Sequence, residues 1–161
     1  MSDHSVFATP ALDWIMSLWV RIAPGEDLGR CVEGQRSNYP ILGGHFEGPD
    51  LRGEVLPGGA DQYLLRPDGV GELDARYSLL SDRGERINIH NRGVLWLDEE
   101  GRRLEAEGIW PLAMERYRCS CSPTFQVARG RLEGLRQAVF IGRVHYPSVD
   151  WVRIDCYRLG G

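Results

Sequence analysis

A period-two alternation of apolar and polar residues marks the first part of the chain. Between residues 12 and 22 every even position is apolar, whereas the odd positions include polar side chains such as Asp13 and Arg21. Because successive side chains of a strand point to opposite faces, this pattern predicts a long strand with one buried face. Pro24 and Gly25 end it, and the glycine-rich, charged segment from there to Ser37 is predicted to be a loop.

The clearest hairpin is predicted between residues 72 and 93. Asp82-Arg83-Gly84 fits a three-residue loop whose glycine takes the left-handed conformation. A shift of this register by one residue would mix the two faces of both strands. In the predicted, unshifted register one face of the hairpin is mainly apolar and pairs Leu79 with Ile87, Tyr77 with Ile89 and Ala75 with Asn91. The other face is polar and pairs Arg76 with His90 and Asp74 with Arg92. The last of these is a charge pair, which adds cross-strand support.

Shorter strands are predicted along the rest of the chain, at residues 39–46, 51–56, 62–66, 116–125, 137–146 and 149–159. The charged segment from residue 97 to 114 is predicted to be a long loop with a short helix near residues 102–107. About eight to nine strands ordered as successive hairpins favour an all-β fold, a single closed antiparallel β-barrel with little helix. One domain is expected to span residues 1–161, with residues 1–10 as an N-terminal extension.

Composition narrows the functional classes. The formal charge is −4, and all 19 cationic residues are arginine, so lysine Schiff-base chemistry is excluded and no basic footprint for nucleic acid is present. The apolar stretch from residue 12 to 23 is too short for a membrane span, and the N-terminus lacks the charge of a signal peptide, so a cytoplasmic protein is expected. The cysteines show no zinc spacing and are expected to be free thiols: Cys31, Cys119, Cys121 and Cys156.

Glycines broken by short apolar pieces fill residues 43–61. Isolated glycines in strand-like sequence mark bulges, bends or places where another backbone comes close, so this run predicts a curved sheet around a small cavity. Asp61, at its end, can serve as a general base if desolvation raises its pKa; the alternative is a turn aspartate that caps backbone amides. No metal-binding spacing is found in the run or elsewhere, and no metal is expected.

Ordered short motifs resemble a known family: Phe46-Glu47-Gly48-Pro49, Gly53 through Asp61, Leu73 through Tyr77, Asn91-Arg92-Gly93 and Val139 through Gly142. This family is domain of unknown function 3237, also called uncharacterised protein family 0311, and the resemblance spans roughly residues 12 to 159. It implies one antiparallel barrel, broadly similar to those of allene oxide cyclase and dirigent proteins, and no established cofactor. Some relatives in natural-product pathways look like cyclases, which implies small organic substrates. His45 departs from the small residue that many members have there.

Further candidates lie on both faces of the predicted hairpin. Tyr77 and Asn91 share the apolar face, where a hydroxyl can protonate an enolate and a buried amide without partners is costly; the alternative for Tyr77 is an ordinary core tyrosine. Arg76 and His90 share the other face, where they can bind an anion and move a proton, or simply form a solvated surface. If the barrel is filled by apolar side chains, as small barrels are, the apolar face points inward and Arg76 outward. A ligand-binding barrel can break that rule, so Arg76 stays a catalytic candidate and His90 a substrate-binding one.

Three residues complete the candidate site. His45 can form an acid/base dyad with a carboxylate such as Glu54, although loop histidines are more often uncommitted, and Trp110 is assigned to the wall of the substrate cavity. The function expected is cyclisation, isomerisation or elimination of a small organic molecule, aromatic or polyketide-like, by acid/base and shape control without cofactor. The alternatives are a non-catalytic barrel that binds or carries an apolar metabolite, and an interaction protein without a usable cavity. The protein can form a homo-oligomer with any of these functions.

Overall fold

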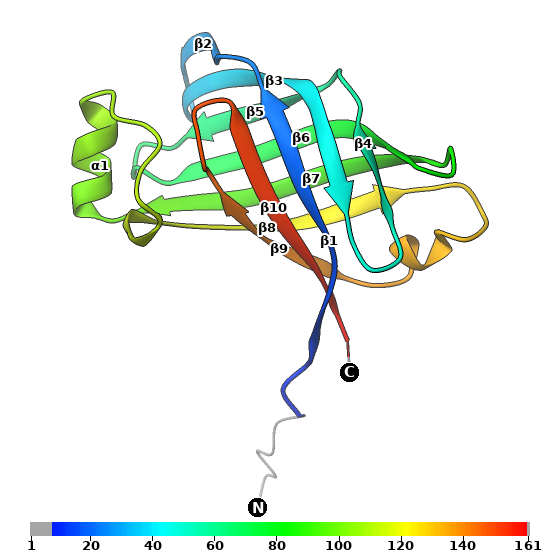
Figure 1. The fold of residues 1–161 in the computed structure, drawn as a ribbon. Coiled ribbons are helices and arrows are strands. Elements are labelled where there is room, and N and C mark those ends of the chain that lie inside the picture. Colours follow the sequence, from blue (N-terminus) through cyan, green and yellow to red (C-terminus); the bar gives the residue numbers. More distant parts are fainter. Residues whose placement is uncertain (1–7, 161) are drawn as a thin grey trace, which may run out of the picture.

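The structure is a computed structural model that describes residues 8–160, so residues 1–7 of the expected N-terminal extension lie outside the described part. Across residues 8–160 the chain forms ten antiparallel strands in one sheet that closes on itself (Figure 1). The strands are β1 (Leu12–Ile22), β2 (Glu26–Cys31), β3 (Gly34–Glu47), β4 (Arg52–Val55), β5 (Ala60–Leu65), β6 (Gly71–Ser81), β7 (Arg86–Leu97), β8 (Tyr117–Gln126), β9 (Phe140–His145) and β10 (Trp151–Leu159).

The sheet closes because β1 pairs with β10 on one side and with β3 on the other. From β10 the order runs through β9, β8, β7 and β6, and both β4 and β5 then pair with β6 and with β3. The barrel is therefore eight strands round, with β4 and β5 in line at one position, and β2 adds an extra strand outside β3. The predicted all-β fold, a closed antiparallel barrel, is confirmed.

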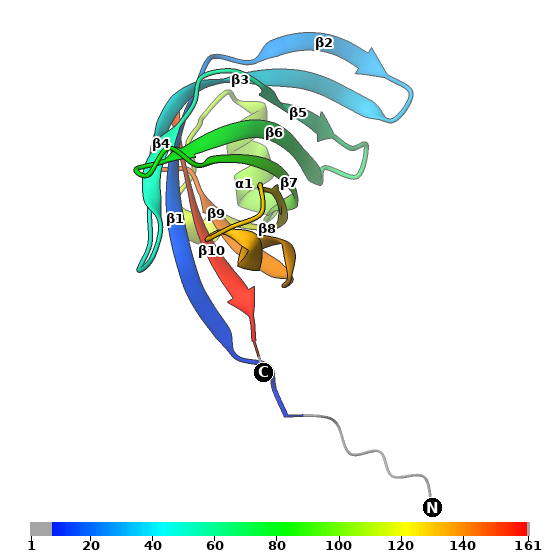
Figure 2. The ribbon, with the colours of Figure 1, turned by 90° about the vertical axis from the view of Figure 1, so that its right-hand side faces the viewer.

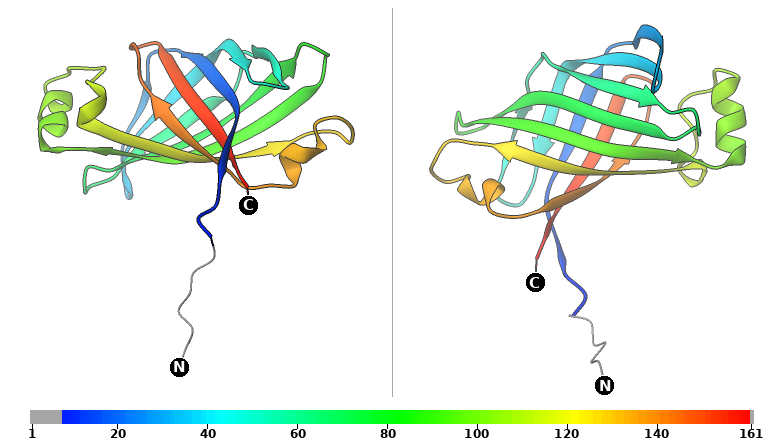
Figure 3. Two further views of the ribbon diagram at one scale, coloured as in Figure 1. Left: turned by 60° about the horizontal axis from the view of Figure 1, so that its bottom comes forward. Right: turned by 180° about the vertical axis from the view of Figure 1, so that it is seen from behind.

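Helices lie at the two ends of this barrel. The helix α1 (Glu99–Ala106) begins after Asp98, whose carboxylate accepts a hydrogen bond from the Gly101 backbone N–H at 2.7 Å. It lies at one end, and the 3₁₀ turn η2 (Glu133–Arg136) lies at the other (Figures 1 and 3). A second 3₁₀ turn, η1 (Met114–Arg116), leads into β8. None of the helices within residues 8–160 has the length and apolarity needed to cross a membrane.

The predicted hairpin has the register that its two faces required. Leu79 lies opposite Ile87, Tyr77 opposite Ile89, and Gly84 has a φ of +81° in the loop. Arg76 is exposed, so the apolar face is the one that points inward, and the face with Arg76 and His90 points outward. One detail is corrected: Asp74 lies opposite Arg92, but its carboxylate contacts Nε2 of His90, at 2.6 Å.

Two predictions near the N-terminus are wrong. The segment predicted to be a loop up to Ser37 instead forms β2 and the start of β3. Most residues of β2 are exposed, so its glycine and charged side chains are compatible with a strand. In β1, Met16 is buried, whereas Trp14 is 45% exposed. The register shifts between these two residues, so Ile15 forms a bulge and reverses the alternation of faces.

The segment from residue 97 to 114 also differs from its prediction. The helix α1 begins at Glu99, three residues before the predicted start, because Asp98 caps it. Most of its residues are charged, and only Gly101 is buried, so hydrophobic periodicity gave little sign of it.

The glycine-rich run provides the close approach that the sequence predicted. Gly44 lies opposite Val20 where β1 and β3 close the barrel, and its φ is +136°. A Cβ atom at Gly44 would lie 1.9 Å from the carbonyl oxygen of Trp19. Only glycine lets the two backbones come this close.

The interior is packed at one end and hollow at the other. At the η2 end Phe46, Leu79 and Ile87 are almost completely buried, and the rings of Phe125 and Phe140 meet edge to face with centroids 5.2 Å apart. This is the end nearer the viewer in Figure 2, where α1 is seen behind the barrel. At the α1 end, side chains leave a cavity.

Candidate functional site

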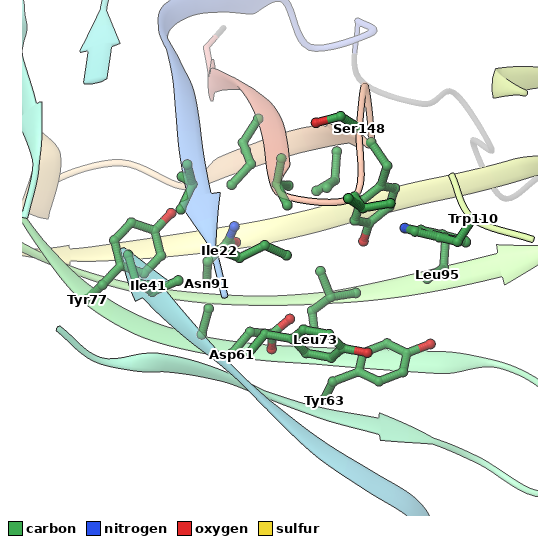
Figure 4. A pocket seen from close by; sticks show the side chains of 18 of the residues that line it. Ile22, Ile41, Asp61, Tyr63, Leu73, Tyr77, Asn91, Leu95, Trp110 and Ser148 are labelled. Carbon is green, nitrogen blue, oxygen red and sulfur yellow. The ribbon is translucent and has the colours of Figure 1, made fainter. Parts of the chain in front are cut away.

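The cavity has a volume of about 330 Å³ and is open at the α1 end of the barrel. Its wall is made by the strands β1, β3, β5, β6, β7, β9 and β10, together with α1, the segment after α1 and the turn between β9 and β10. Most side chains that line it are aliphatic or aromatic, as in typical small-molecule sites. Asp61, Tyr77, Asn91 and Trp110 are among them, and they point into the cavity from four different segments (Figure 4).

Three strands place Asp61 and Asn91 in one row on the inner face. Asp61 on β5 lies opposite Ala75 on β6, and Ala75 lies opposite Asn91 on β7. Tyr39 on β3 extends the row on the other side of Asp61. The small side chain of Ala75 leaves space between the carboxyl group and the amide, so both polar groups face the cavity across it.

The carboxyl group of Asp61 is held at a gap in the β5–β6 ladder. The paired residues run from Ala60 to Asp61 and resume at Leu64, and within this interval the backbone N–H of Asp74 donates to Oδ1 of Asp61 at 2.8 Å. Burial raises the pKa of Asp61 from 3.8 to about 6, although this hydrogen bond opposes the rise. A carboxyl group with this pKa can accept or release a proton near neutral pH.

Tyr77 and Asn91 carry polar atoms that no group in the described part of the chain satisfies. Both residues are buried, with 6% and 4% of their surface exposed. Within residues 8–160 the hydroxyl of Tyr77 and Oδ1 of Asn91 have no hydrogen-bond partner. Burial also raises the pKa of Tyr77, so the phenol stays protonated and can donate a hydrogen bond. Unsatisfied buried polar groups are rare in proteins, and here both line the cavity.

Aromatic side chains form the open end. The rings of Trp110 and Tyr146 meet at an angle of 63° with centroids 5.1 Å apart, and Trp110 turns its indole nitrogen toward the cavity (Figure 4). Tyr146 is fixed in turn, because its backbone N–H donates to the hydroxyl of Tyr117 at 3.1 Å. Tyr63 lines the same end.

The structure does not bring the other four predicted residues to the cavity. Arg76 and His90 lie opposite each other on the outer face of β6 and β7, where they border a separate hollow. His45 is exposed on the outer face of β3, and its ring stacks on Trp19 with centroids 4.9 Å apart. Glu54 lies opposite His45 on β4 and is exposed as well. These four residues lie outside the cavity because alternate residues of a barrel strand face outward, and each of them occupies an outward-facing position.

The sequence matches the family model described as protein of unknown function DUF3237 over residues 10–159. The chain belongs to the DUF3237 family. A relative from Rhodopseudomonas palustris, a UPF0311 protein, is 30% identical over 153 residues, which cover 94% of this chain and 99% of the relative. The match bears out the family resemblance seen in the short motifs.

Solved structures place this DUF3237 chain among barrels. A conserved protein of unknown function from R. palustris superposes with a TM-score of 0.87 at 27% identity, covering 95% of this chain and 99% of the other. A beta-barrel like protein from Acinetobacter baumannii gives a TM-score of 0.82 at 28% identity, covering 96% and 98%. An enzyme from Penicillium herquei gives 0.70 at 16% identity, covering 96% and 98%, which shows a shared fold.

Several lining residues of this DUF3237 barrel were missed from the sequence. Tyr63 lies two positions after Asp61 on β5, so the period of two could have placed it on the inner face. Tyr39 lies two positions before Ile41 on β3, so the same period of two places it on the inner face. Glu105 gave no such signal, because only the docking of α1 across the end of the barrel brings it to the cavity.

No metal centre is evident in the part of the chain that the structure describes, where His, Cys, Asp and Glu side chains form no group of three or more that could hold an ion. The best polar groups for holding a ligand are Asp61, Tyr77 and Asn91. The expectation that the protein needs no cofactor stays a prediction.

Proposed function

We propose that this protein is an enzyme that rearranges a small organic molecule by proton transfer inside the barrel, giving cyclisation, isomerisation or elimination. The observation that carries the proposal is the position of Asp61. It is a desolvated carboxyl group with a pKa of about 6 on the wall of a largely apolar cavity. Groups whose pKa is shifted toward neutrality by burial are typical of catalytic acids and bases.

The three polar side chains divide the work. Asp61 takes a proton from an acidic C–H or O–H group of the substrate and returns it at another atom, while the Asp74 N–H holds its carboxylate in place. Tyr77 donates to the oxygen on which negative charge develops, and Asn91 orients the substrate through its unpaired amide oxygen. This proton transfer changes no oxidation state, and it needs no cofactor.

The shape of the cavity and the fold support the same function. A cavity of about 330 Å³ suits a compact ring system, and its aromatic open end suits an aromatic or polyketide-like substrate of secondary metabolism. A barrel of the same fold serves an enzyme in P. herquei, which supports the proposal at the level of the fold alone. Four free cysteines fit a cytoplasmic enzyme.

The test follows proton exchange without requiring the natural substrate. Two-ring aromatic ketones with an acidic C–H group, such as 2-tetralone, are incubated with the protein in D₂O, and loss of the C–H signal is followed by NMR. We expect exchange to rise with pH around 6 as Asp61 ionises, to fall at least 100-fold in Asp61→Asn, and to fall less in Tyr77→Phe and Asn91→Ala. His45→Ala and His90→Ala are matched controls, because both residues lie outside the cavity, and they should exchange as the wild type does.

A non-catalytic barrel that binds or carries an apolar metabolite is the second candidate, favoured by the aliphatic character of most of the cavity wall. The same experiment separates the two. If the wild type binds the ketone saturably but exchanges its proton no faster than Asp61→Asn does, the carrier function is supported and the proposed enzyme is overturned.

A further inference from the structure

The glutamate of α1 that lines the cavity has no cation to pair with. On the exposed side of the helix Arg103 bridges Glu100 and Glu107, with N···O distances of 2.6 and 2.8 Å. Glu105 has neither an ion pair nor a hydrogen bond to its side chain within residues 8–160, and burial raises its pKa. Of these three glutamates, the one at the cavity is thus the one left without a partner.

Aromatic rings accompany this carboxylate at the open end of the cavity. Tyr39, Tyr63 and Trp110 line the same space, and the rings of Tyr39 and Tyr63 are nearly perpendicular, with centroids 6.1 Å apart. Glu105 and Tyr63 both line the cavity, and the pKa of Tyr63 is raised mainly by burial and next by the negative charge of Glu105. The backbone makes room for Tyr63, because a Cβ atom at Gly71 would lie 2.0 Å from that hydroxyl.

The charge of the cavity is of one sign. Among the described residues that line it, Asp61 and Glu105 are the two ionisable carboxyl groups, and no arginine or histidine is present. An anionic ligand would meet two carboxylates without a compensating cation, and a neutral ligand would leave Glu105 desolvated and unpaired. A cationic ligand supplies the missing charge, and aromatic faces add cation–π attraction.

We propose that Glu105, Tyr39, Tyr63 and Trp110 form a recognition site for an ammonium group, and that the ligand of this cavity is an aromatic amine. The ammonium group binds at the open end, and the aromatic body extends inward, past Tyr63 toward Asp61, which lies two residues earlier on β5. The proposal rests on the proposed function in so far as the reacting atom is the one that reaches Asp61.

Three ligands that share a naphthalene ring test the charge preference: 1-naphthylmethylamine, 1-naphthalenemethanol and 1-naphthoate. Binding is measured at low ionic strength from the shift of the Trp110 indole N–H signal, assigned with Trp110→Phe. We expect the amine to bind roughly tenfold more tightly than the alcohol and the naphthoate to bind most weakly. In Glu105→Gln the amine should lose this advantage, and helix propensity is nearly unchanged by the substitution.

Glu107→Gln is the matched control, because Glu107 caps the C-terminus of the same helix but pairs with Arg103, and it should keep the wild-type preference. The proposal is overturned if the amine does not bind, if the alcohol or naphthoate binds as tightly, or if the preference survives Glu105→Gln. A preference that disappears only in Asp61→Asn would move the ammonium site to Asp61 and would equally overturn it.

The two proposals fail separately. If Asp61→Asn loses proton exchange but the wild type shows no preference for the amine, the proposed enzyme is supported and the proposed amine ligand is overturned. If the preference for the amine depends on Glu105 but the wild type and Asp61→Asn exchange protons equally fast, the ammonium site is supported and the proposed enzyme is overturned.

Discussion

The backbone N–H of Asp74 donates to the carboxylate of Asp61, with the nitrogen and Oδ1 2.8 Å apart. The bond joins two neighbouring strands through a side chain at a point where their ladder is interrupted. It fixes one oxygen of Asp61 to the barrel wall. Burial nevertheless outweighs it, so folding favours the protonated carboxyl group.

Stability should therefore depend on pH through Asp61. The cost of ionising it in the folded protein is absent below pH 3.8, grows from there to about pH 6, and is complete above that. Asp61→Asn removes the charge and keeps an oxygen for the Asp74 N–H. We expect this variant to exceed the wild type at pH 8 by up to roughly 3 kcal/mol in free energy of unfolding, and the two to converge near pH 4.

Urea unfolding at the two pH values measures this difference. Asp68→Asn is the control, because Arg66 holds the pKa of Asp68 below its usual range, so its removal should lower stability at pH 8. Equal stability of the wild type and Asp61→Asn at pH 8 would contradict a buried, destabilised carboxylate.

Removing the hydroxyl of Tyr77 should stabilise the protein. The hydroxyl is buried and has no hydrogen-bond partner within residues 8–160, so Tyr77→Phe relieves a desolvation cost and should raise the free energy of unfolding by about 1 kcal/mol. Tyr117 is equally buried, with 6% exposed, but its hydroxyl accepts the backbone N–H of Tyr146, so Tyr117→Phe should lower stability by about 1–2 kcal/mol. If both variants lost stability, the Tyr77 hydroxyl would have a partner within the barrel.

Closure of the barrel should depend on Gly44 and much less on its neighbour. Gly43 and Gly44 both have positive φ, at +143° and +136°, so alanine is strained at either position. A Cβ atom at Gly44 meets the Trp19 carbonyl oxygen at 1.9 Å, whereas at Gly43 the nearest atom, the Val55 carbonyl oxygen, is 3.6 Å away. We expect Gly44→Ala to cost at least about 2 kcal/mol more than Gly43→Ala in thermal or urea unfolding. Similar losses would mean that β1 can move away from β3 at little cost.

Local patterns predicted the regular parts of this fold and missed those that depend on distant contacts. The hairpin from Gly71 to Leu97 was predictable residue by residue, because its turn and its two faces agree on a single register. The bulge at Ile15 was not, since nothing in the alternation of β1 reveals where an extra residue enters the ladder. The strand β2 was hidden by its glycine and charges, which an outer strand exposed to solvent tolerates.

The same division applies to the candidate site. Asp61 was proposed from its place at the end of the glycine-rich run, and Tyr77 and Asn91 from their polar groups on the apolar face of the hairpin; all three line the cavity. Arg76 and His90 were also candidates, because the sequence left open which face lines the interior, and the structure places them away from the cavity. Glu105 needed the tertiary position of α1, which no local pattern encodes.

The barrel places the packing that stabilises its fold at one end and the cavity that can hold a ligand at the other. Side chains near η2 pack against one another and hold the strands together, whereas those near α1 line a cavity, so some of them can be changed without rebuilding the scaffold. A change of a few side chains at the α1 end can therefore alter which molecule the cavity accepts, while the barrel itself is kept, as it is in a structure of only 16% identity.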